Sequence, residues 1–220
     1  MDVTVIGATG RIGKRVARML AERGHDVRGV NRRPDRAAVV LAGSGVRTCT
    51  ADTGDEASLA PALAGADTAV LTTAPTREDP SAYLTQTASV LRAVRHAGVT
   101  RLVAVSSYVA LRAPDGRTVL EAEPAHPYFR PIEEVYPAQA AMFRAETGLD
   151  WLLVAPAAEL YPYGEVTRGY RVARDVLVVT DPASPNFKET SVLSMEDLAA
   201  FITDEVEHPA RHRQLVTLAY

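Results

Sequence analysis

The stretch VTVIGATGRIGKRV, from Val3 to Val16, decides the fold of this sequence. A short apolar run comes first, the glycine-rich segment GATGRIG follows, and residues with helical periodicity come last. Gly7 allows a sharp turn after the strand, Gly10 leaves room for a pyrophosphate at the helix N-terminus, and Gly13 allows close helix–sheet contact. Because the three glycines stand between a strand and a helix, they predict a dinucleotide-binding loop.

Strand-like and helix-like segments alternate through the first half of the chain. Apolar runs that predict strands lie at 3–8, 26–31, 46–51, 67–74 and 101–107. Helices are expected from the glycine loop to about Arg23 and over 37–45, 55–66 and 81–96. Continuous apolar strands between helices indicate a parallel sheet that is covered on both faces. The predicted fold is an α/β, doubly wound parallel sheet (Rossmann fold) with helices on both faces and a small C-terminal substrate-side appendage.

The alternation ends after Ser107. The expected elements are then a loop (108–127), a helix (about 129–147), a strand (150–156), short strands within 170–181 and 189–194, a helix capped by Ser194, and a last strand (214–220). Long loops at the C-terminal ends of strands are where such folds build substrate sites. We therefore predict a single domain over 1–220, whose substrate side is built mainly from about 108–135 and 154–194.

Composition excludes several classes of function. The 220 residues carry a net charge of −3, which gives no indication of a nucleic-acid partner or a membrane surface. No apolar run reaches membrane-spanning length, no basic leader precedes the first strand, and the single cysteine fits a reducing compartment, so a cytoplasmic protein is expected. No histidine or cysteine has metal-ligand spacing, so no metal is expected.

The segment NRRP, from Asn31 to Pro34, ends the second predicted strand. A protein that binds NAD usually has a carboxylate there, which accepts hydrogen bonds from the ribose hydroxyls. Here Arg32 and Arg33 could instead pair with a 2′-phosphate, and Arg11 points to the same region. The alternative is that these arginines are solvated surface residues. We favour NADPH over NADH as the cofactor.

The third and fourth predicted strands also end in candidate cofactor contacts. The carboxylate of Asp52 could accept from the adenine amine while the Thr53 backbone contacts the ring. With equal weight, Asp52 could simply cap the following helix. Thr73 and Ala74 end the fourth strand, where the chain should pass beneath the ribose next to the nicotinamide.

These motifs together resemble a known family. VIGATGRIG, NRRP and VSS at the fifth strand are similar to the atypical short-chain dehydrogenase/reductases of the NAD(P)H-binding, NmrA-like group. In the second half, GLDWLLVAPAAELYPYGEVTRGYRV and SVLSMEDLAAF resemble the NADH-flavin reductase-like members and, more distantly, flavin reductases of the biliverdin reductase B type. The resemblance covers nearly the whole chain except about 108–135. The same group contains redox sensors and regulators.

The resemblance implies a set of cofactor contacts. By position, the residues expected along the dinucleotide are Gly7, Thr9, Gly10, Arg11, Ile12 and Gly13 at the pyrophosphate, Arg32 at the adenosine phosphate, Asp52 and Thr53 at adenine, Thr73 and Ala74 at the ribose, and Ser106 and Ser107 at the nicotinamide. The segment 154–160, which contains Pro156, would lie over the nicotinamide. The stretch YPYGEVTRG departs from the family pattern by adding tyrosines where substrate would enter, which puts a plain flavin substrate in doubt.

The usual catalytic acid of carbonyl reductases is missing. In a Tyr-x-x-x-Lys pair the lysine lowers the pKa of the tyrosine, so that the phenol can protonate an alkoxide. Tyr128 is followed four residues later by Ile132, Tyr136 by Ala140, and no lysine lies between Lys14 and Lys188. What remains is hydride transfer to an acceptor that spreads the charge over a ring and takes its proton from water.

Three candidate catalytic residues remain, each with a plainer alternative. Ser107 could bind the substrate or the nicotinamide carboxamide, or only the backbone. His126 could be a general acid, although it lies between prolines in a predicted surface loop. Tyr128 lies eight residues before Tyr136, so both could share one helical face and either stack on a planar substrate or pack against the sheet.

The sequence therefore predicts an NAD(P)H-dependent reductase that transfers hydride to a flavin, quinone or similar conjugated ring. The alternatives are a non-catalytic NADP(H)-binding redox sensor, and a reductase or isomerase of a specialised aromatic or polyketide metabolite. The expected partner is a small planar acceptor, with no nucleic acid and no membrane, and the chain is expected to be a monomer or homodimer.

Overall fold

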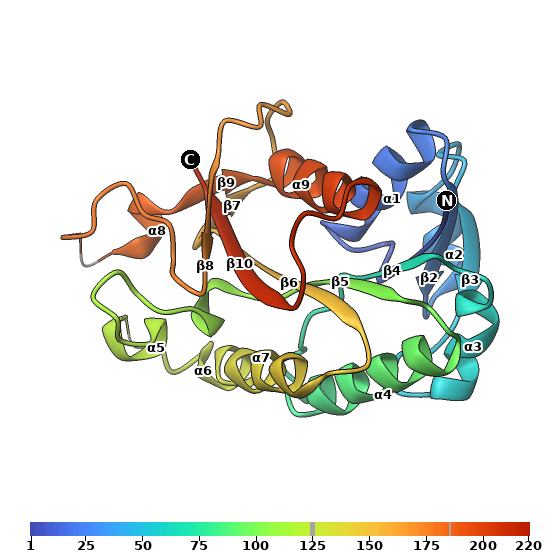
Figure 1. The fold of residues 1–220 in the computed structure, drawn as a ribbon, viewed down its shortest axis with the longest axis horizontal. Coiled ribbons are helices and arrows are strands. Elements are labelled where there is room, and N and C mark those ends of the chain that lie inside the picture. The colour runs from blue at the N-terminus through green and yellow to red at the C-terminus, as the bar shows by residue number, and fades with distance from the viewer. Residues whose placement is uncertain (124–125, 185) are drawn as a thin grey trace.

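A computed structural model describes residues 1–123, 126–184 and 186–220. Its main sheet has eight strands in the order β3-β2-β1-β4-β5-β6-β10-β8, and a small second sheet pairs β7 with β9 (Figure 1). The strands are β1 (Asp2–Ile6), β2 (Asp26–Asn31), β3 (Arg47–Thr50), β4 (Thr68–Leu71), β5 (Arg101–Val105), β6 (Asp150–Pro156), β7 (Glu159–Tyr161), β8 (Arg171–Arg174), β9 (Val192–Ser194) and β10 (Gln214–Ala219). All neighbours in the main sheet run parallel except β8, which pairs antiparallel with β10. The predicted doubly wound sheet is confirmed.

Helices cover both faces of the sheet. They are α1 (Gly13–Glu22), α2 (Pro34–Val40), α3 (Glu56–Leu63), α4 (Ala82–His96), the 3₁₀ turn η1 (Tyr108–Ala110), α5 (Val119–Ala122), α6 (Arg130–Glu133), α7 (Val135–Ala145), α8 (Phe187–Thr190) and α9 (Met195–Glu207). Figure 1 shows α1 and α9 on one face and α3, α4 and α7 on the other. The fully buried strand β4 contributes Val70 to one apolar layer and Leu71 to the other. Alternate residues of a strand point to opposite faces, so the sheet needs a helical cover on each side.

Two helix boundaries depend on proline. The helix expected over about 129–147 is divided into α6 and α7. Pro137 has no backbone N–H to donate to the carbonyl of Glu133, so a continuous helix through this point would lose a hydrogen bond. The second expected helix begins earlier than predicted, because Pro34 occupies the first helical position of α2, where a missing N–H costs nothing.

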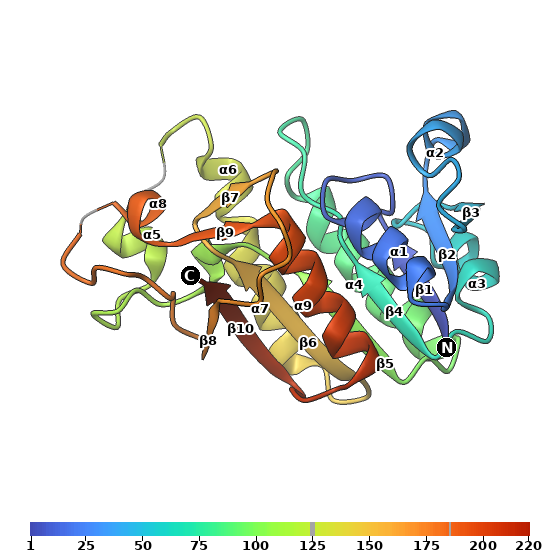
Figure 2. The ribbon, with the colours of Figure 1, turned by 90° about the horizontal axis from the view of Figure 1, so that it is seen from above.

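The region expected to be a plain loop, 108–127, contains η1 and α5. Thr118 and Glu121 form a capping box that starts α5, a signal that the sequence offers but that the proline-rich surroundings obscure. β7 and α8 were also not predicted, since each is too short to show a period. Figure 2 shows α5, α8, β7 and β9 gathered at one end of the molecule, away from α2 and β3.

The last helix begins as the sequence predicts. The hydroxyl of Ser194 accepts a hydrogen bond of 3.0 Å from the backbone N–H of Asp197, which caps α9. None of the helices that the structure describes is long and apolar enough to cross a membrane.

Candidate functional site

The three glycines of the loop after β1 have different structural roles. A Cβ at Gly13 would lie 2.3 Å from the carbonyl oxygen of Gly7 and 2.5 Å from Oγ1 of Thr72. Gly7 has a φ of 86°, and its Cβ would lie 2.9 Å from the same Thr72 oxygen. Both glycines therefore allow the turn, α1 and the end of β4 to approach one another closely. Thr72 fills the space, with its hydroxyl donating to the carbonyl of Ile6 at 2.9 Å.

Gly10 is less crowded than Gly7 and Gly13. A Cβ there would meet the Gly7 carbonyl at 3.2 Å, and its next neighbour would be 3.9 Å away. Gly10 lines a cleft of about 650 Å³ at the C-terminal ends of β1, β2, β4 and β5. Its missing side chain keeps this cleft free at the N-terminus of α1, where backbone N–H groups and the helix dipole favour an anion. The residues present fit the pyrophosphate of a dinucleotide.

The cleft brings most of the predicted cofactor residues together. The predicted residues that line it are Gly7, Thr9, Gly10, Arg11, Ile12, Arg32, Arg33, Thr53, Thr73, Ala74 and Ser106. Gly13 lies beneath the loop rather than in the cleft, and Pro156 is buried at the end of β6. Neither of these two is among the residues that line the cleft.

One end of the cleft is cationic. Arg32, Arg33 and Arg36 all line it, and all three side chains are exposed. Asn31 ends β2, and its Oδ1 accepts from the backbone N–H of Arg33 at 3.0 Å, which fixes the turn into α2. The guanidinium of Arg36 lies 3.4 Å from the carbonyl oxygen of Thr9 in the glycine loop. Arg36 was not predicted, although it lies three residues after Arg33, in the first turn of α2.

Thr53 lines the cleft beside Ala51, whereas Asp52 is not among the lining residues. The carboxylate of Asp52 accepts from the N–H of Gly54 at 2.9 Å and so holds the turn before α3. The cap of α3 is Asp55, whose carboxylate accepts from Ala57 at 2.9 Å. The alternative in which Asp52 caps this helix is therefore wrong.

The other end of the cleft, which we call the neutral end, is lined by the uncharged polar side chains of Ser106, Tyr83 and Tyr136; the cleft lining also includes an acidic side chain, Asp79, in the loop before α4. Ser106 Oγ donates to Gln139 Oε1 at 2.8 Å, and Gln139 Nε2 donates to the hydroxyl of Tyr83 at 2.7 Å. The Tyr83 hydroxyl in turn donates to the Thr73 carbonyl at 3.3 Å. Burial raises the pKa of Tyr83, so this phenol keeps its proton. We call Ser106, Gln139 and Tyr83 the buried triad; Gln139 and Tyr83 were not predicted, and nothing in their local sequence marks them.

Tyr136 lies beside the buried triad and lines the cleft. Its ring meets the ring of Tyr83 edge to face, with centroids 5.8 Å apart. Burial, with a smaller contribution from Glu133, raises the pKa of Tyr136 to about 12. The phenol therefore stays protonated near neutral pH, and the position four residues later, where a lysine would lower this pKa, holds the buried Ala140.

Comparison with known proteins decides the family. Residues 7–209 match the model of a family described as NAD(P)H-binding. The chain belongs to this NAD(P)H-binding family. The match agrees with the atypical short-chain dehydrogenase/reductase resemblance of its motifs, and it shows that the cofactor is a nicotinamide dinucleotide.

Three known proteins are similar to this chain. A crystal structure of a suggested exported protein from Burkholderia pseudomallei has a TM-score of 0.83 to this chain. The two sequences are 29% identical, and the comparison covers 100% of both chains. A suggested NADH-flavin reductase from Streptococcus pneumoniae TIGR4 is 22% identical, with a TM-score of 0.80 over 100% of this chain and 99% of that one, which shows the shared fold. A (4-alkanoyl-5-oxo-2,5-dihydrofuran-3-yl)methyl phosphate reductase from Streptomyces griseus is 40% identical over 114 residues, 51% of this chain and 36% of the relative.

The three predicted catalytic candidates of this NAD(P)H-binding protein lie outside the lining of the cleft. Ser107 is half-buried at the start of η1, where its carbonyl accepts from Ala110 at 3.0 Å. His126 is exposed, and its Nδ1 accepts from the N–H of Tyr128 at 3.2 Å. The guanidinium of Arg77 stacks on the Tyr128 ring, 3.4 Å from its centroid.

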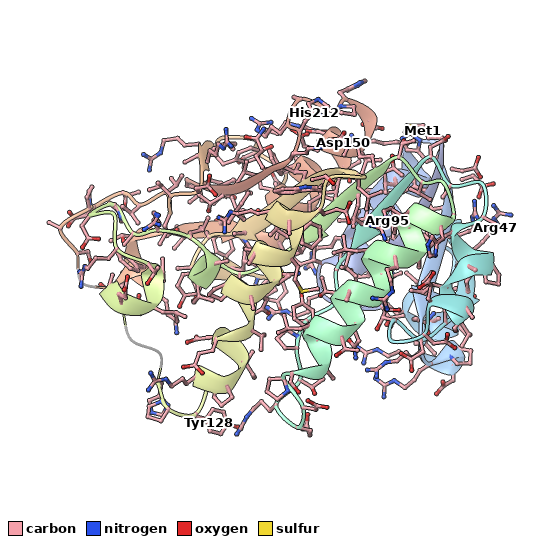
Figure 3. All side chains as sticks on the ribbon, turned by 60° about the horizontal axis from the view of Figure 1, so that its bottom comes forward. Met1, Arg47, Arg95, Tyr128, Asp150 and His212 are labelled. Atoms are coloured by element: carbon pink, nitrogen blue, oxygen red, sulfur yellow. The ribbon has the colours of Figure 1, made fainter. Side chains whose placement is uncertain are left out.

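Tyr128 and Tyr136 do not share one helical face. Tyr128 precedes α6 and is 53% exposed, whereas Tyr136 belongs to α7 and faces the cleft. Figure 3 shows Tyr128 at the edge of the molecule opposite Met1 and Asp150, which mark the starts of β1 and β6. The expectation of a shared face is wrong because the helix is interrupted between the two residues.

Arg15 links the glycine loop to the tyrosine-containing segment that follows β7. Its guanidinium donates to the Arg11 carbonyl at 2.8 Å and to the Pro162 carbonyl at 2.6 Å, and pairs with Glu196 of α9 at 2.8 Å. Arg15 therefore connects the glycine loop with the chain around Pro162 and with α9. Within residues 1–123, 126–184 and 186–220, no group of three histidine, cysteine or acidic side chains is placed to hold a metal ion.

Proposed function

We propose that this protein is an NADPH-dependent reductase that passes hydride to a flavin, a quinone or a similar conjugated ring. The observation that carries the proposal is the cleft, which is lined by three arginines at one end and by Ser106, Tyr83 and Tyr136 at the other. The charged end suits the adenosine phosphate, and the neutral end suits the nicotinamide. In this proposal the substrate enters from the side built by about 108–135 and 154–194.

Arg32, Arg33 and Arg36 support NADPH over NADH. A planar guanidinium forms paired, charge-assisted hydrogen bonds with phosphate oxygens. At the end of β2, where a carboxylate would accept from ribose hydroxyls, the chain has Asn31, and its amide oxygen is already engaged by the Arg33 N–H. A 2′-phosphate would meet cations here and no acidic side chain of the β2 end.

The acceptor class follows from the protonation of Tyr136. With a pKa of about 12 and no lysine in the position that activates a tyrosine, this phenol is a weak acid but a competent hydrogen-bond donor. The bound cofactor would supply the hydride, and the chain positions the acceptor. An acceptor that delocalises the new charge can then take its proton from solvent. The Streptomyces griseus relative, named as a reductase of an oxo-dihydrofuran with an alkanoyl group, also takes an unsaturated carbonyl-bearing ring.

The direct test is to mix the purified protein with NADPH and, separately, FMN, riboflavin, a quinone, an unsaturated lactone and a simple ketone. We expect loss of the reduced-nicotinamide absorbance with at least one conjugated acceptor and none above background with the ketone. Failure with every conjugated acceptor would contradict the proposal.

A redox sensor that binds NADP(H) without turnover is the second candidate, because the chain lacks a Tyr-x-x-x-Lys pair. It predicts similar affinity for the oxidised and reduced cofactor, or a structural change on binding, together with no oxidation of NADPH by the acceptor panel. Turnover with any conjugated acceptor would exclude it.

A further inference from the structure

The hydrogen-bond polarity of the buried triad can be read from its two ends. The carbonyl oxygens of Thr73 and Val105 can only accept hydrogen bonds. The Tyr83 hydroxyl donates to the first, at 3.3 Å, and the Gln139 amide nitrogen lies 3.4 Å from the second. These two fixed acceptors decide the direction of every bond between them.

The Gln139 amide has one orientation that satisfies both ends. With Nε2 towards Tyr83 and Val105, the amide donates to the phenol oxygen and to the carbonyl. A flipped amide would place Oε1 against the Val105 carbonyl, where two acceptors would repel each other. Oε1 therefore faces Ser106, and Ser106 Oγ must donate its hydrogen to it, at 2.8 Å.

We propose that Ser106 presents only hydrogen-bond-accepting lone pairs to the cleft, and that Gln139 is the positioning residue that enforces this polarity. The ligand group that Ser106 binds is the amino group of the nicotinamide carboxamide. The inference rests on the proposed function in placing the nicotinamide at this end of the cleft. Gln139 is fully buried and Ser106 is 6% exposed, so water has little access to compete for either group.

The polarity has a chemical consequence. A serine that already donates its hydrogen cannot donate it to the carbonyl of an acceptor substrate, because Gln139 Oε1 would then lose that donor inside the protein. Ser106 therefore orients the nicotinamide ring and takes no part in polarising the acceptor. This fits a reaction whose acceptor needs no acid from the protein.

The test uses a reduced NADPH analogue in which an acetyl group replaces the carboxamide, so that the carbonyl is kept and the N–H groups are lost. We expect the wild type to bind NADPH about tenfold more tightly than the analogue, as one hydrogen bond is lost. Ser106→Ala should weaken NADPH and remove the preference. Gln139→Met should also reduce it, because the freed Ser106 hydroxyl can now donate to the acetyl oxygen.

Tyr83→Phe is a matched control. It leaves the Val105 carbonyl to hold the Gln139 amide, so it should retain the wild-type preference. A purely structural role for the buried triad would lower affinity for both ligands equally in every variant. Circular dichroism melting checks that each variant is folded, and if Gln139→Met does not fold, the comparison of Ser106→Ala with Tyr83→Phe decides the polarity.

The outcomes separate this inference from the proposed function. Absence of NADPH binding by the wild type would contradict both. Binding of NADPH with no preference over the acetyl analogue, or a preference that Ser106→Ala leaves intact, would overturn the inference while leaving an NADPH-binding protein.

Discussion

The two ends of the cleft are built on opposite principles. The cationic end takes Arg32, Arg33 and Arg36 from one loop and the first turn of α2, and all three are exposed. The neutral end takes Ser106, Tyr83 and Gln139 from the residue after β5, from α4 and from α7, and all three are buried and joined by hydrogen bonds. Exposed charges attract a ligand but are screened by salt, whereas buried neutral groups fix orientation and tolerate little change.

The largest expected effect tests the loop between the two ends. Gly13→Ala would place a methyl group 2.3 Å from the Gly7 carbonyl, which the turn cannot accommodate without moving. We expect the free energy of unfolding to fall by about 3 kcal/mol or more, measured by chemical denaturation.

Gly10→Ala is the matched control for this change. Its Cβ would lie 3.2 Å from the Gly7 carbonyl oxygen and 3.9 Å from that of Thr72, much less crowded than at Gly13, and Gly10 lines the cleft. Stability should therefore stay close to that of the wild type, while affinity for the cofactor should fall at least about tenfold because the methyl group occupies the pyrophosphate site. Equal effects of the two substitutions on stability would show that the glycines do not have the separate roles assigned here.

Affinity for NADPH should fall when an arginine is removed from the cationic end of the cleft. Removal of one guanidinium in Arg36→Ala should weaken NADPH binding about tenfold at low salt and less at high salt, as measured by NADPH fluorescence titration. Arg47→Ala removes an exposed arginine that pairs with Asp26 at the start of β2, far from the C-terminal ends of the strands, and should leave the affinity unchanged. Similar losses in both variants would mean that the effect is one of net charge alone.

Tyr136→Phe gives a smaller expected effect. The variant keeps the ring against Tyr83 and removes only the hydroxyl that can donate to an acceptor. We expect KM for the acceptor to rise a few-fold, with kcat little changed, since one neutral hydrogen bond contributes about 1 kcal/mol. A fall in kcat of about a thousandfold would instead identify Tyr136 as an acid in the reaction.

The smallest effect is an expected absence in the pH profile. Because the pKa of Tyr136 is raised to about 12, kcat should show no tyrosine ionisation between about pH 7 and 10.

The raised pKa of Tyr136 also makes the stability of the fold depend on pH. Burial of the neutral phenol contributes to the free energy of unfolding below the unfolded pKa of about 10, and this contribution is lost as the pH rises towards 12. Unfolding measured between these values should show a steeper loss of stability in the wild type than in Tyr136→Phe.

The same contrast explains how much could be predicted from the sequence. The glycine loop and NRRP are contiguous motifs with local physical meaning, so the dinucleotide fold and the part of the cleft lining that these motifs form could be predicted. Arg36 was within reach of the same reasoning, because it lies one helical turn beyond Arg33.

The neutral end could not be predicted because its residues meet only through tertiary structure. Gln139 lies 33 residues from Ser106 and 56 from Tyr83 in the chain, and nothing local to any of them indicates the contact. The predicted catalytic candidates Ser107, His126 and Tyr128 have suitable chemistry but lie in a region with few local signals of structure. The break between α6 and α7 then separates Tyr128 from the cleft that Tyr136 lines.

The most direct test of the account is the ratio of the dissociation constants for NADPH and NADH. The wild type should bind NADPH at least about tenfold more tightly, since the 2′-phosphate meets the arginines. Arg32→Ala should bring this ratio towards one, and Arg47→Ala should leave it unchanged. A wild type that binds NADH as tightly as NADPH, with a ratio that Arg32→Ala does not alter, would contradict the account.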